Sequence, residues 1–220
     1  MRMRRKKNLE ARLTAVSEYI IETDRSFLNV KLAVENKDYL CYEQIFGNAN
    51  PVSLEIGCGK GGFICKTAKV SPEKNFLAVE MMQNIIVMAG EKAKSMGVEN
   101  LKFINTGAEY LPRYIRPESL DTIYLNFSPP FPQKSYECRR LTNERNVKNY
   151  YDFLVKGGCV VQKTDDKEFF EYSYSQLAKI GFKVIDTTDA LATDEKNIHT
   201  EYEEKFKKLG MKIYRLVAEK

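Results

Sequence analysis

A carboxylate followed by four closely spaced glycines gives residues 55–62 the composition of a ligand-binding turn. The apolar run 52–56 predicts a buried strand, and the residues after the turn can begin a helix. Strand, glycine turn and helix in that order form a nucleotide-cradling unit. Glycine permits a tight turn and lets a ligand lie against bare backbone. The acid is Glu55, and the glycines are Gly57, Gly59, Gly61 and Gly62.

Two ligand classes fit the spacing of this turn. It matches the G-x-G-x-x-G pattern of dinucleotide sites and the G-x-G-x-G pattern of S-adenosylmethionine enzymes. Glu55 would attract the ammonium and sulfonium groups of S-adenosylmethionine, whereas it would repel the pyrophosphate of NAD. About twenty residues after the turn, a second predicted strand ends at Glu80, where a carboxylate can bind ribose hydroxyls. We therefore expect S-adenosylmethionine to be the cofactor.

The composition indicates a globular α/β protein rather than a membrane or metal-binding one. The chain has 220 residues, 43% of them apolar, and 35 Lys and Arg against 30 Asp and Glu give a net charge of +5. Five cysteines form no C-x-x-C pair and His199 is the single histidine, so we expect no metal site. We find no apolar run long enough to span a membrane and no signal-peptide core at the N-terminus, and we expect a cytoplasmic protein.

Basic residues are concentrated at the N-terminus, where five of the six positions from 2 to 7 are Arg or Lys. Such an arm often binds a polyanion, and a solvated tail is the alternative. We expect residues 1–30 to form this arm with a helical or irregular extension, and residues 31–220 to form the main domain. The basic residues are Arg2, Arg4, Arg5, Lys6 and Lys7.

Strand and helix patterns alternate along the rest of the chain, which predicts a mostly parallel seven-stranded sheet with helices on both faces. The expected strands are 52–56, 75–80, 101–105, 120–126, 159–163, 182–185 and 211–217. The expected helices are 32–46, 61–70, 83–96, 108–113, 143–155 and 166–179. Ligands of such sheets bind at the carboxyl ends of the strands. The glycine turn, Glu80, the pair 107–108 and the segments 126–131 and 163–165 should therefore share one rim.

Several blocks of the sequence together resemble the bacterial tRNA (guanine-N(7)-)-methyltransferases, which are class I S-adenosylmethionine-dependent methyltransferases with a Rossmann-like fold. The blocks follow one another in the family's order over nearly the whole chain. The block near the C-terminus is the most specific, because generic methyltransferases lack it. The blocks are residues 1–4, the L-E-I-G-C-G-K-G turn, 123–128, 139–142, 163–165 and 200–206.

The resemblance implies methyl transfer from S-adenosylmethionine to N(7) of a variable-loop guanosine in tRNA, and it assigns roles to individual positions. The cofactor would be bound by Glu55, Gly57, Gly59, Glu80, Gly107, Ala108 and Asn126. The target guanosine would be contacted by Gln133, Asp165, Thr200, Glu201, Tyr202 and Glu203. From their basic charge, we expect the RNA to be contacted by Arg2, Arg4, Arg5, Lys134, Arg139 and Arg140.

The chain departs from the family pattern after the fourth predicted strand. The usual Ser-Asp-Pro-Trp-Pro-Lys-Lys-Arg-His is replaced by Ser-Pro-Pro-Phe-Pro-Gln-Lys-Ser-Tyr. Pro129 takes the place of the active-site acid, Gln133 that of a substrate lysine, and Gly107 that of an acid after the third strand. Because N(7) carries a free lone pair, the reaction needs no general base and relies on positioning. No catalytic residue is assigned, and Asp165 is the acidic candidate that remains.

Two other functions are compatible with the replaced loop. Ser-Pro-Pro-Phe also fits the [DNS]-P-P-[YFW] signature of methyltransferases that act on exocyclic amines of adenine or cytosine, in which an aromatic ring such as Phe131 stacks the flipped base. The loss of the acid and the lysine would also suit a tRNA-binding protein with weak catalysis. The sequence is compatible with a monomer or a homodimer.

Overall fold

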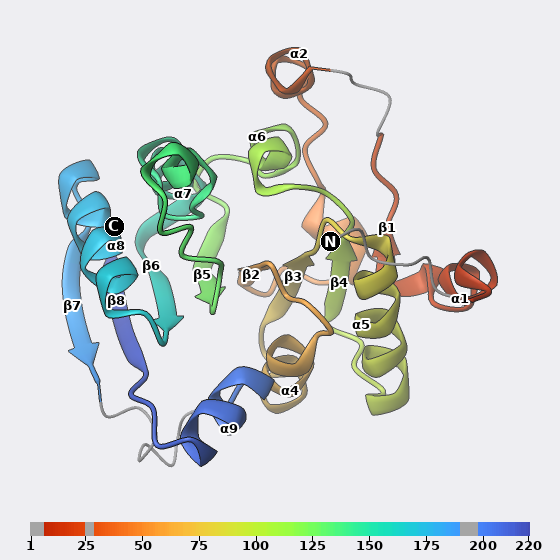
Figure 1. The fold of residues 1–220 in the computed structure, drawn as a ribbon. Helices are drawn as coiled ribbons and strands as arrows, with labels where there is room; N and C mark the ends of the chain where they lie inside the picture. Colours follow the sequence, from red (N-terminus) through yellow and green to blue (C-terminus); the bar gives the residue numbers. More distant parts are fainter. Residues whose placement is uncertain (1–6, 25–28, 190–197) are drawn as a thin grey trace.

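The computed structural model describes residues 7–24, 29–189 and 198–220, and its centre is an eight-stranded sheet (Figure 1). The strand order is β1-β4-β3-β2-β5-β6-β8-β7, and only β8 runs antiparallel to its neighbours. The expected Rossmann-like α/β fold is confirmed. The strands are β1 (Ile20–Ile21), β2 (Val52–Ile56), β3 (Asn75–Val79), β4 (Leu101–Ile104), β5 (Leu120–Asn126), β6 (Leu154–Thr164), β7 (Lys183–Thr188) and β8 (Tyr214–Glu219).

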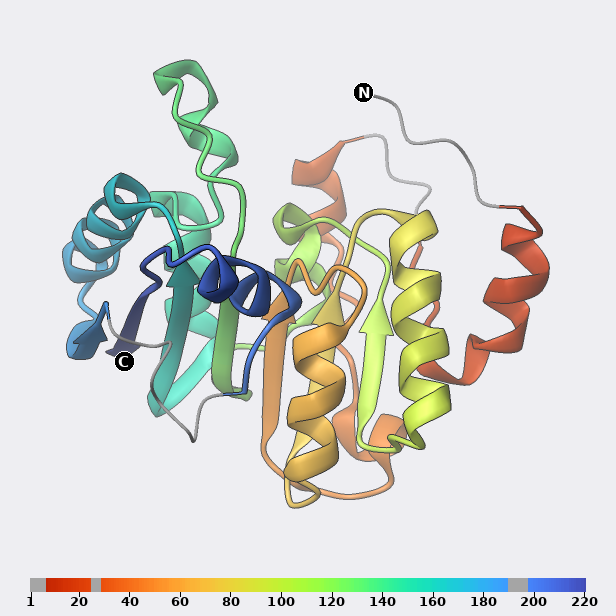
Figure 2. The same ribbon diagram turned by 60° about the horizontal axis from the view of Figure 1, so that its bottom comes forward.

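Helices connect the strands and cover both faces of the sheet (Figure 2). The α-helices are α1 (Leu9–Ala15), α2 (Val30–Glu35), α3 (Tyr42–Phe46), α4 (Gly62–Val70), α5 (Gln83–Met96), α6 (Leu111–Tyr114), α7 (Glu144–Phe153), α8 (Lys167–Ile180) and α9 (Glu201–Lys208). The described ranges also contain the short 3-10 helices η1 (Ser17–Tyr19), η2 (Ala108–Tyr110) and η3 (Lys134–Arg139).

Alternating side chains of the central strands build two cores on opposite faces of the sheet. On β3, Leu77 belongs to the core that includes Tyr150 of α7 and Leu177 of α8. Its neighbour Phe76 belongs to the core formed with α4 and α5, which includes Ile86. Strands buried on both faces read as nearly continuous apolar runs, because each successive side chain points into a core.

The order of the strands reverses at β2, which lies between β3 and β5. From β2 the chain proceeds to β3 and β4 on one side, and later to β5 and β6 on the other. The carboxyl ends of β2 and β5 therefore border a crevice of the kind in which such sheets bind ligands. Glu55 on β2 is paired in register with Tyr124 on β5, so Asn126, the last residue of β5, lies beside the glycine turn.

The sheet has eight strands rather than the expected seven, because Ile20 and Ile21 pair with Phe103 and Ile104 of β4. The preceding helix α1 is packed as well. Its core contacts join Leu9 to Val87 of α5. Residues 9–21 thus contribute to the core and to the sheet edge. The domain boundary at residue 30 stays a prediction, and residues 1–6 of the basic arm lie outside the described part.

The expected helix 32–46 is wrong in its middle, where the chain forms α2 and α3 separated by an extended segment. In that segment the N–H groups of Asp38 and Leu40 donate to the carbonyls of Arg113 and Tyr114, each at 2.9 Å. These tertiary hydrogen bonds replace helical ones. The expected end of the helix is correct, since Gly47 closes α3 with a left-handed φ of 71°.

Other elements also differ from expectation. The helix expected to reach residue 155 ends at Phe153, and β8 begins at Tyr214 rather than at residue 211. The strand expected at 159–163 begins earlier, because β6 includes Gly157 and Gly158 and absorbs them as an irregularity in its pairing with β5. Residues 201–208, expected only as part of a motif, form the helix α9. The sequence of α9 is mostly charged, so it lacks the apolar periodicity that predicts a helix. The ion pair between Glu203 and Lys163 attaches α9 to the sheet. Across the described ranges, no helix has the length and apolar character of a membrane span, and no cluster of His, Cys, Asp and Glu has the arrangement of a metal site.

Candidate active site

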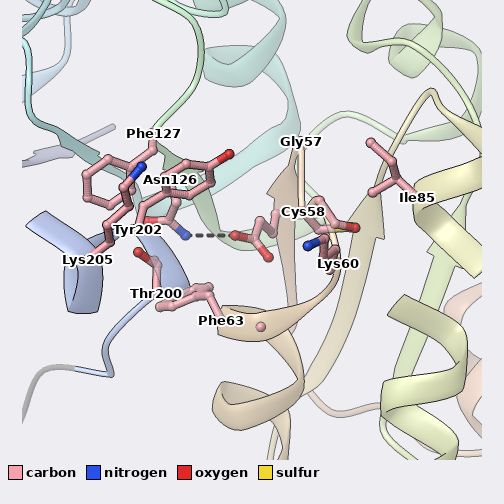
Figure 3. Close-up of a pocket in the computed structure, with 13 residues that line it drawn as sticks. Gly57, Cys58, Lys60, Phe63, Ile85, Asn126, Phe127, Thr200, Tyr202 and Lys205 are labelled. Carbon is pink, nitrogen blue, oxygen red and sulfur yellow. Dashed lines mark hydrogen bonds between the residues drawn. The ribbon is translucent and has the colours of Figure 1, made fainter. Parts of the chain in front are cut away.

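A cleft of about 370 Å³ opens at the carboxyl ends of β2 and β5 (Figure 3). Its volume lies in the range of small-molecule sites. One wall comes from the glycine turn and the start of α4, and the other from the end of β5 and from α9. The lining residues are Glu55, Gly57, Cys58, Gly59, Lys60, Gly62, Phe63, Ile85, Asn126, Phe127, Thr200, Tyr202 and Lys205.

The glycine turn presents bare backbone to the cleft. Gly57 and Gly59 have left-handed φ angles of 81° and 56°, and a Cβ atom at either position would meet no other atom within 4 Å. Gly61 serves packing instead, because a Cβ there would lie 3.0 Å from the Cβ of Ala89 on α5. The turn is fixed by the N–H groups of Gly57 and Cys58, which donate to Val79 O at 2.8 and 3.0 Å.

Glu55 places a buried carboxylate at the floor of the cleft. The side chain is 2% exposed, and its Oε1 accepts a 2.8 Å hydrogen bond from Asn126 Nδ2, the dashed line in Figure 3. Burial raises the pKa of Glu55 to about 7, against the opposing effects of the Asn126 hydrogen bond and the charge of Lys163. Among the described residues, Glu55 Oε2 and Asn126 Oδ1 have no hydrogen-bond partner.

Two unsatisfied buried acceptors side by side fit a ligand that brings hydrogen-bond donors and positive charge. S-adenosylmethionine has both, in its ammonium and sulfonium groups. The start of α4 borders the same cleft through Gly62, and the positive end of a helix dipole suits a carboxylate such as that of a methionyl group. The residues present therefore fit the expected cofactor.

The other expected cofactor residues lie at neighbouring strand ends, outside the lining of this cleft. Glu80 follows β3, is buried, and accepts a 2.9 Å hydrogen bond from the N–H of Met82. Gly107 and Ala108 follow β4. A Cβ atom at Gly107 would lie 2.5 Å from Glu109 Oε2, so the Glu109 carboxylate covers the face that a side chain at 107 would occupy.

A buried ion pair attaches α9 to the sheet beside the cleft. Lys163 of β6 is 4% exposed, and its Nζ lies 3.1 Å from Glu203 Oε2 and donates to Ile198 O at 3.1 Å. Burial lowers the pKa of Lys163, and the neighbouring Glu203 carboxylate opposes that shift. The same ammonium lies 5.2 Å from the centre of the Phe63 ring. One lysine thus joins β6, the segment before α9 and the wall formed by α4.

Thr200 and Glu203 use their polar atoms to begin α9. Thr200 N–H donates to Glu203 Oε2 at 2.7 Å, and Glu203 N–H donates to Thr200 Oγ1 at 2.9 Å, which is a capping box. Glu203 is 1% exposed, so its carboxylate is committed to the helix and to Lys163. The guanosine contacts expected of Thr200 and Glu203 stay predictions. The side chain of Glu201 lies outside the described part.

Asp165 and Gln133 do not line the cleft. Asp165 follows β6 and is half-buried, whereas Gln133 is exposed at the start of η3. The segment around η3 projects from the body of the molecule (Figure 2). Of the six residues expected to contact the guanosine, Thr200 and Tyr202 line the cleft. The contacts expected of Asp165 and Gln133 stay predictions.

The residues expected to contact RNA lie in different environments. Lys134 and Arg139 are exposed on the projecting segment, and the Arg139 guanidinium lies 4.6 Å from the centre of the Tyr136 ring. Arg140 donates instead to Pro130 O at 2.8 Å and Phe131 O at 3.1 Å, so it clamps the proline-rich loop. Arg2, Arg4 and Arg5 belong to residues 1–6, which lie outside the described residues.

Sequence reasoning gave no individual role to Phe127 or Lys205, although segment 126–131 was expected at the rim. Phe127 directly follows β5 and lines the cleft, but the neighbouring Ser-Pro-Pro-Phe pattern drew attention to Phe131, which does not line it. An aromatic residue at a strand end was the available signal. Lys205 lies one helical turn after Tyr202, a relation that is visible only once α9 is known to be a helix.

Comparison with known proteins places this geometry in context. Residues 49–216 match the model of a family described as "Putative methyltransferase". A tRNA (guanine-N(7)-)-methyltransferase of Bacillus subtilis (strain 168) is 39% identical over 87% of this chain and 92% of its own length. One of Streptococcus thermophilus (strain CNRZ 1066) is 35% identical over 100% of this chain and 99% of its own.

Solved structures with low sequence identity share the fold. The 16S rRNA methyltransferase KamB superposes with a TM-score of 0.64 at 14% identity, covering 81% of this chain and 91% of its own. A 16S rRNA (adenine(1408)-N(1))-methyltransferase of Catenulisporales acidiphilia, solved with its cosubstrate SAM, gives 0.56 at 14% identity over 88% and 92%. These structures therefore share the expected Rossmann-like fold with this chain.

Proposed function

The chain belongs to the tRNA (guanine-N(7)-)-methyltransferase family, and from that premise we propose that it transfers a methyl group from S-adenosylmethionine to N(7) of a variable-loop guanosine in tRNA. The observation that supports this most directly is the pair of free buried acceptors, Glu55 Oε2 and Asn126 Oδ1, beneath the bare glycine turn. The partner is tRNA and the proposed compartment is the cytoplasm.

The side chains of the cleft bind and orient the two substrates. Glu55 and Asn126 would accept hydrogen bonds from the ammonium group of the cofactor, and the backbone of Gly57 and Gly59 would border it. Glu80, at the neighbouring end of β3, would accept from the ribose hydroxyls. When bound, the cofactor supplies a methyl group activated by the positive charge of its sulfonium.

The remaining work of the protein is positioning. N(7) of guanine has an exposed lone pair and no proton to lose, so the replacement of the family acid by Pro129 removes no obligatory proton acceptor. Good orientation of two reactants can supply up to about 7–11 kcal/mol of the barrier reduction. In this chain the aligned parts are the glycine turn, the end of β5 and α9, which meet at one cleft.

The exocyclic-amine alternative is not favoured. It requires the aromatic residue of Ser-Pro-Pro-Phe to stack the base, and Phe131 does not line the cleft. The curated relatives also act on guanine N(7) by name. A tRNA-binding protein with weak catalysis is disfavoured for a similar reason, since two buried acceptors of the kind that would bind the methyl donor are present at the cleft.

Nucleoside mass spectrometry tests the proposal. Unmodified tRNA transcript is incubated with the protein and S-adenosylmethionine, digested, and compared with a transcript in which adenosine replaces the variable-loop guanosine. We expect 7-methylguanosine from the first transcript only. Methylated adenosine or cytidine would support the exocyclic-amine alternative, and the absence of any methylated nucleoside would leave only RNA binding.

A further inference from the structure

Three aromatic rings gather at one side of the cleft, from segments that are far apart in the sequence. Phe127 comes directly after β5, whereas Tyr202 and Phe206 lie on α9. The Phe127 and Tyr202 rings are stacked, with centres 5.8 Å apart and planes inclined by 24°. Phe206 lies 5.7 Å from Phe127 and 6.2 Å from Tyr202. Phe127 and Tyr202 both line the cleft, on the side of Asn126 (Figure 3).

The backbone at Phe127 holds its ring in an uncommon orientation. Its φ angle is 50°, a left-handed value that a bulky side chain rarely adopts. Such strain persists where the surrounding structure enforces it, and it gathers at functional sites. The N–H group of Phe127 donates to Lys163 O at 2.8 Å, which ties this residue to the end of β6. The left-handed residue turns the chain at the end of β5, where the Phe127 ring lines the cleft.

Lys163 also positions the other half of the ring cluster. Its carbonyl oxygen accepts a hydrogen bond from Phe127 N–H. Its ammonium group donates to Ile198 O and forms an ion pair with Glu203, the residue after Tyr202. A single buried residue therefore sets the spacing between the β5 exit and α9. We regard Lys163 as a positioning residue, because its contacts are with the protein.

Packing alone does not account for these rings. Tyr202 is 58% exposed, and Lys205, on the next turn of α9, lines the same cleft. Exposed aromatic rings beside cations are the composition of single-stranded nucleic-acid sites, in which bases stack on the rings. A purine that entered this cleft would contact the aromatic rings, which lie beside Asn126 and Glu55.

Resting on the proposed function, we propose that the exposed ring of Tyr202, backed by the stacked ring of Phe127, stacks the target guanine and stabilises the positive charge it acquires. In the reaction the N(7) lone pair forms the new N–C bond, the C–S bond breaks with its electrons returning to sulfur, and the positive charge passes to the purine ring. No proton is transferred. The electron-rich face of an aromatic ring attracts a cation, so the interaction strengthens as the charge develops.

The test compares binding of two RNAs rather than activity alone. One tRNA carries guanosine at the target position and the other carries 7-methylguanosine, at a pH where the methylated base keeps its charge. Dissociation constants are measured by fluorescence anisotropy with S-adenosylhomocysteine present. We expect the wild-type protein to prefer the methylated tRNA by on the order of fivefold. We expect Tyr202→Leu and Phe127→Leu to reduce this preference toward one, and Tyr202→Phe to retain it.

Tyr174→Leu is the matched control, because Tyr174 is 45% exposed on α8 and does not line the cleft. Thermal unfolding of each variant checks that the fold is kept. Equal weakening of both RNAs by the Leu variants would show a merely structural role and refute the proposal, as would an unchanged preference. A wild-type protein that methylates no tRNA would refute the proposed function itself, whereas active Leu variants with intact preference would refute only the stacking role.

Discussion

The titration of Glu55 gives the sharpest prediction about the cofactor site. Its carboxylate is buried, and its pKa is raised to about 7 from an ordinary 4.5, chiefly by loss of solvation. Only the ionised form attracts the ammonium and sulfonium groups of the cofactor. We therefore expect affinity for S-adenosylmethionine to rise with pH, by about tenfold between pH 6 and pH 8. The isosteric Glu55→Gln variant should bind more weakly and without this dependence.

The same carboxyl affects stability with the opposite sign. Between the two pKa values the folded protein holds the proton and the unfolded chain has released it, so the free energy of unfolding falls as the pH rises through this window. The contribution is about 2 kcal/mol between pH 5.5 and pH 8. Glu55→Gln removes this pH dependence, so the variant should be more stable than the wild-type protein at both pH values, and its advantage should be larger at pH 8 than at pH 5.5 by about 2 kcal/mol.

Two measurements on the same pair of proteins test this reasoning. Isothermal titration calorimetry at pH 6, 7 and 8 gives the affinities, and the variant corrects for protonation of the ligand itself. Urea denaturation at pH 5.5 and pH 8 gives the free energies of unfolding. If the wild-type protein and Glu55→Gln showed parallel pH profiles in both measurements, Glu55 would not be the titrating group and its role in holding the cation would be refuted.

Three further predictions concern the surroundings of the cleft. Lys163→Met takes the ammonium group away from the buried Glu203 carboxylate, so it should lower the free energy of unfolding by about 3–5 kcal/mol in urea denaturation. Lys163→Met/Glu203→Leu should recover most of the loss, and a loss below about 1 kcal/mol would show that the pair does not anchor α9. Arg139→Ala should reduce the slope of log affinity for tRNA against log salt concentration by about 0.7–0.9. Arg140→Ala removes the hydrogen bonds to the proline-rich loop, so it should lower kcat/KM and leave that slope unchanged. Equal slopes for the two variants would contradict this difference in role. Asp165→Ala should lower kcat/KM for tRNA without changing cofactor affinity, and full activity would remove Asp165 from the guanine site.

Local chemistry in the sequence was sufficient to predict most of the fold. Strands buried on both faces and glycine-terminated helices give strong local signals, and helix 83–96 and strand 120–126 were predicted with their observed bounds. The errors arose where tertiary contacts compete with local preference. Ile20 and Ile21 form an edge strand because they pair with β4. The segment around Asp38 is extended rather than helical because its N–H groups donate to carbonyls near Arg113.

The sequence by itself determined the cofactor class. Glu55 and the glycine spacing select a cationic ligand at a strand end, and a parallel sheet brings all such ends to one rim. Only the tertiary structure decided what faces that ligand. It buries Glu203 against Lys163, assigns Arg140 to the proline-rich loop, and turns Phe127 rather than Phe131 toward the cleft. The physical reason is that burial and pairing depend on segments far apart in the chain, which no local pattern records.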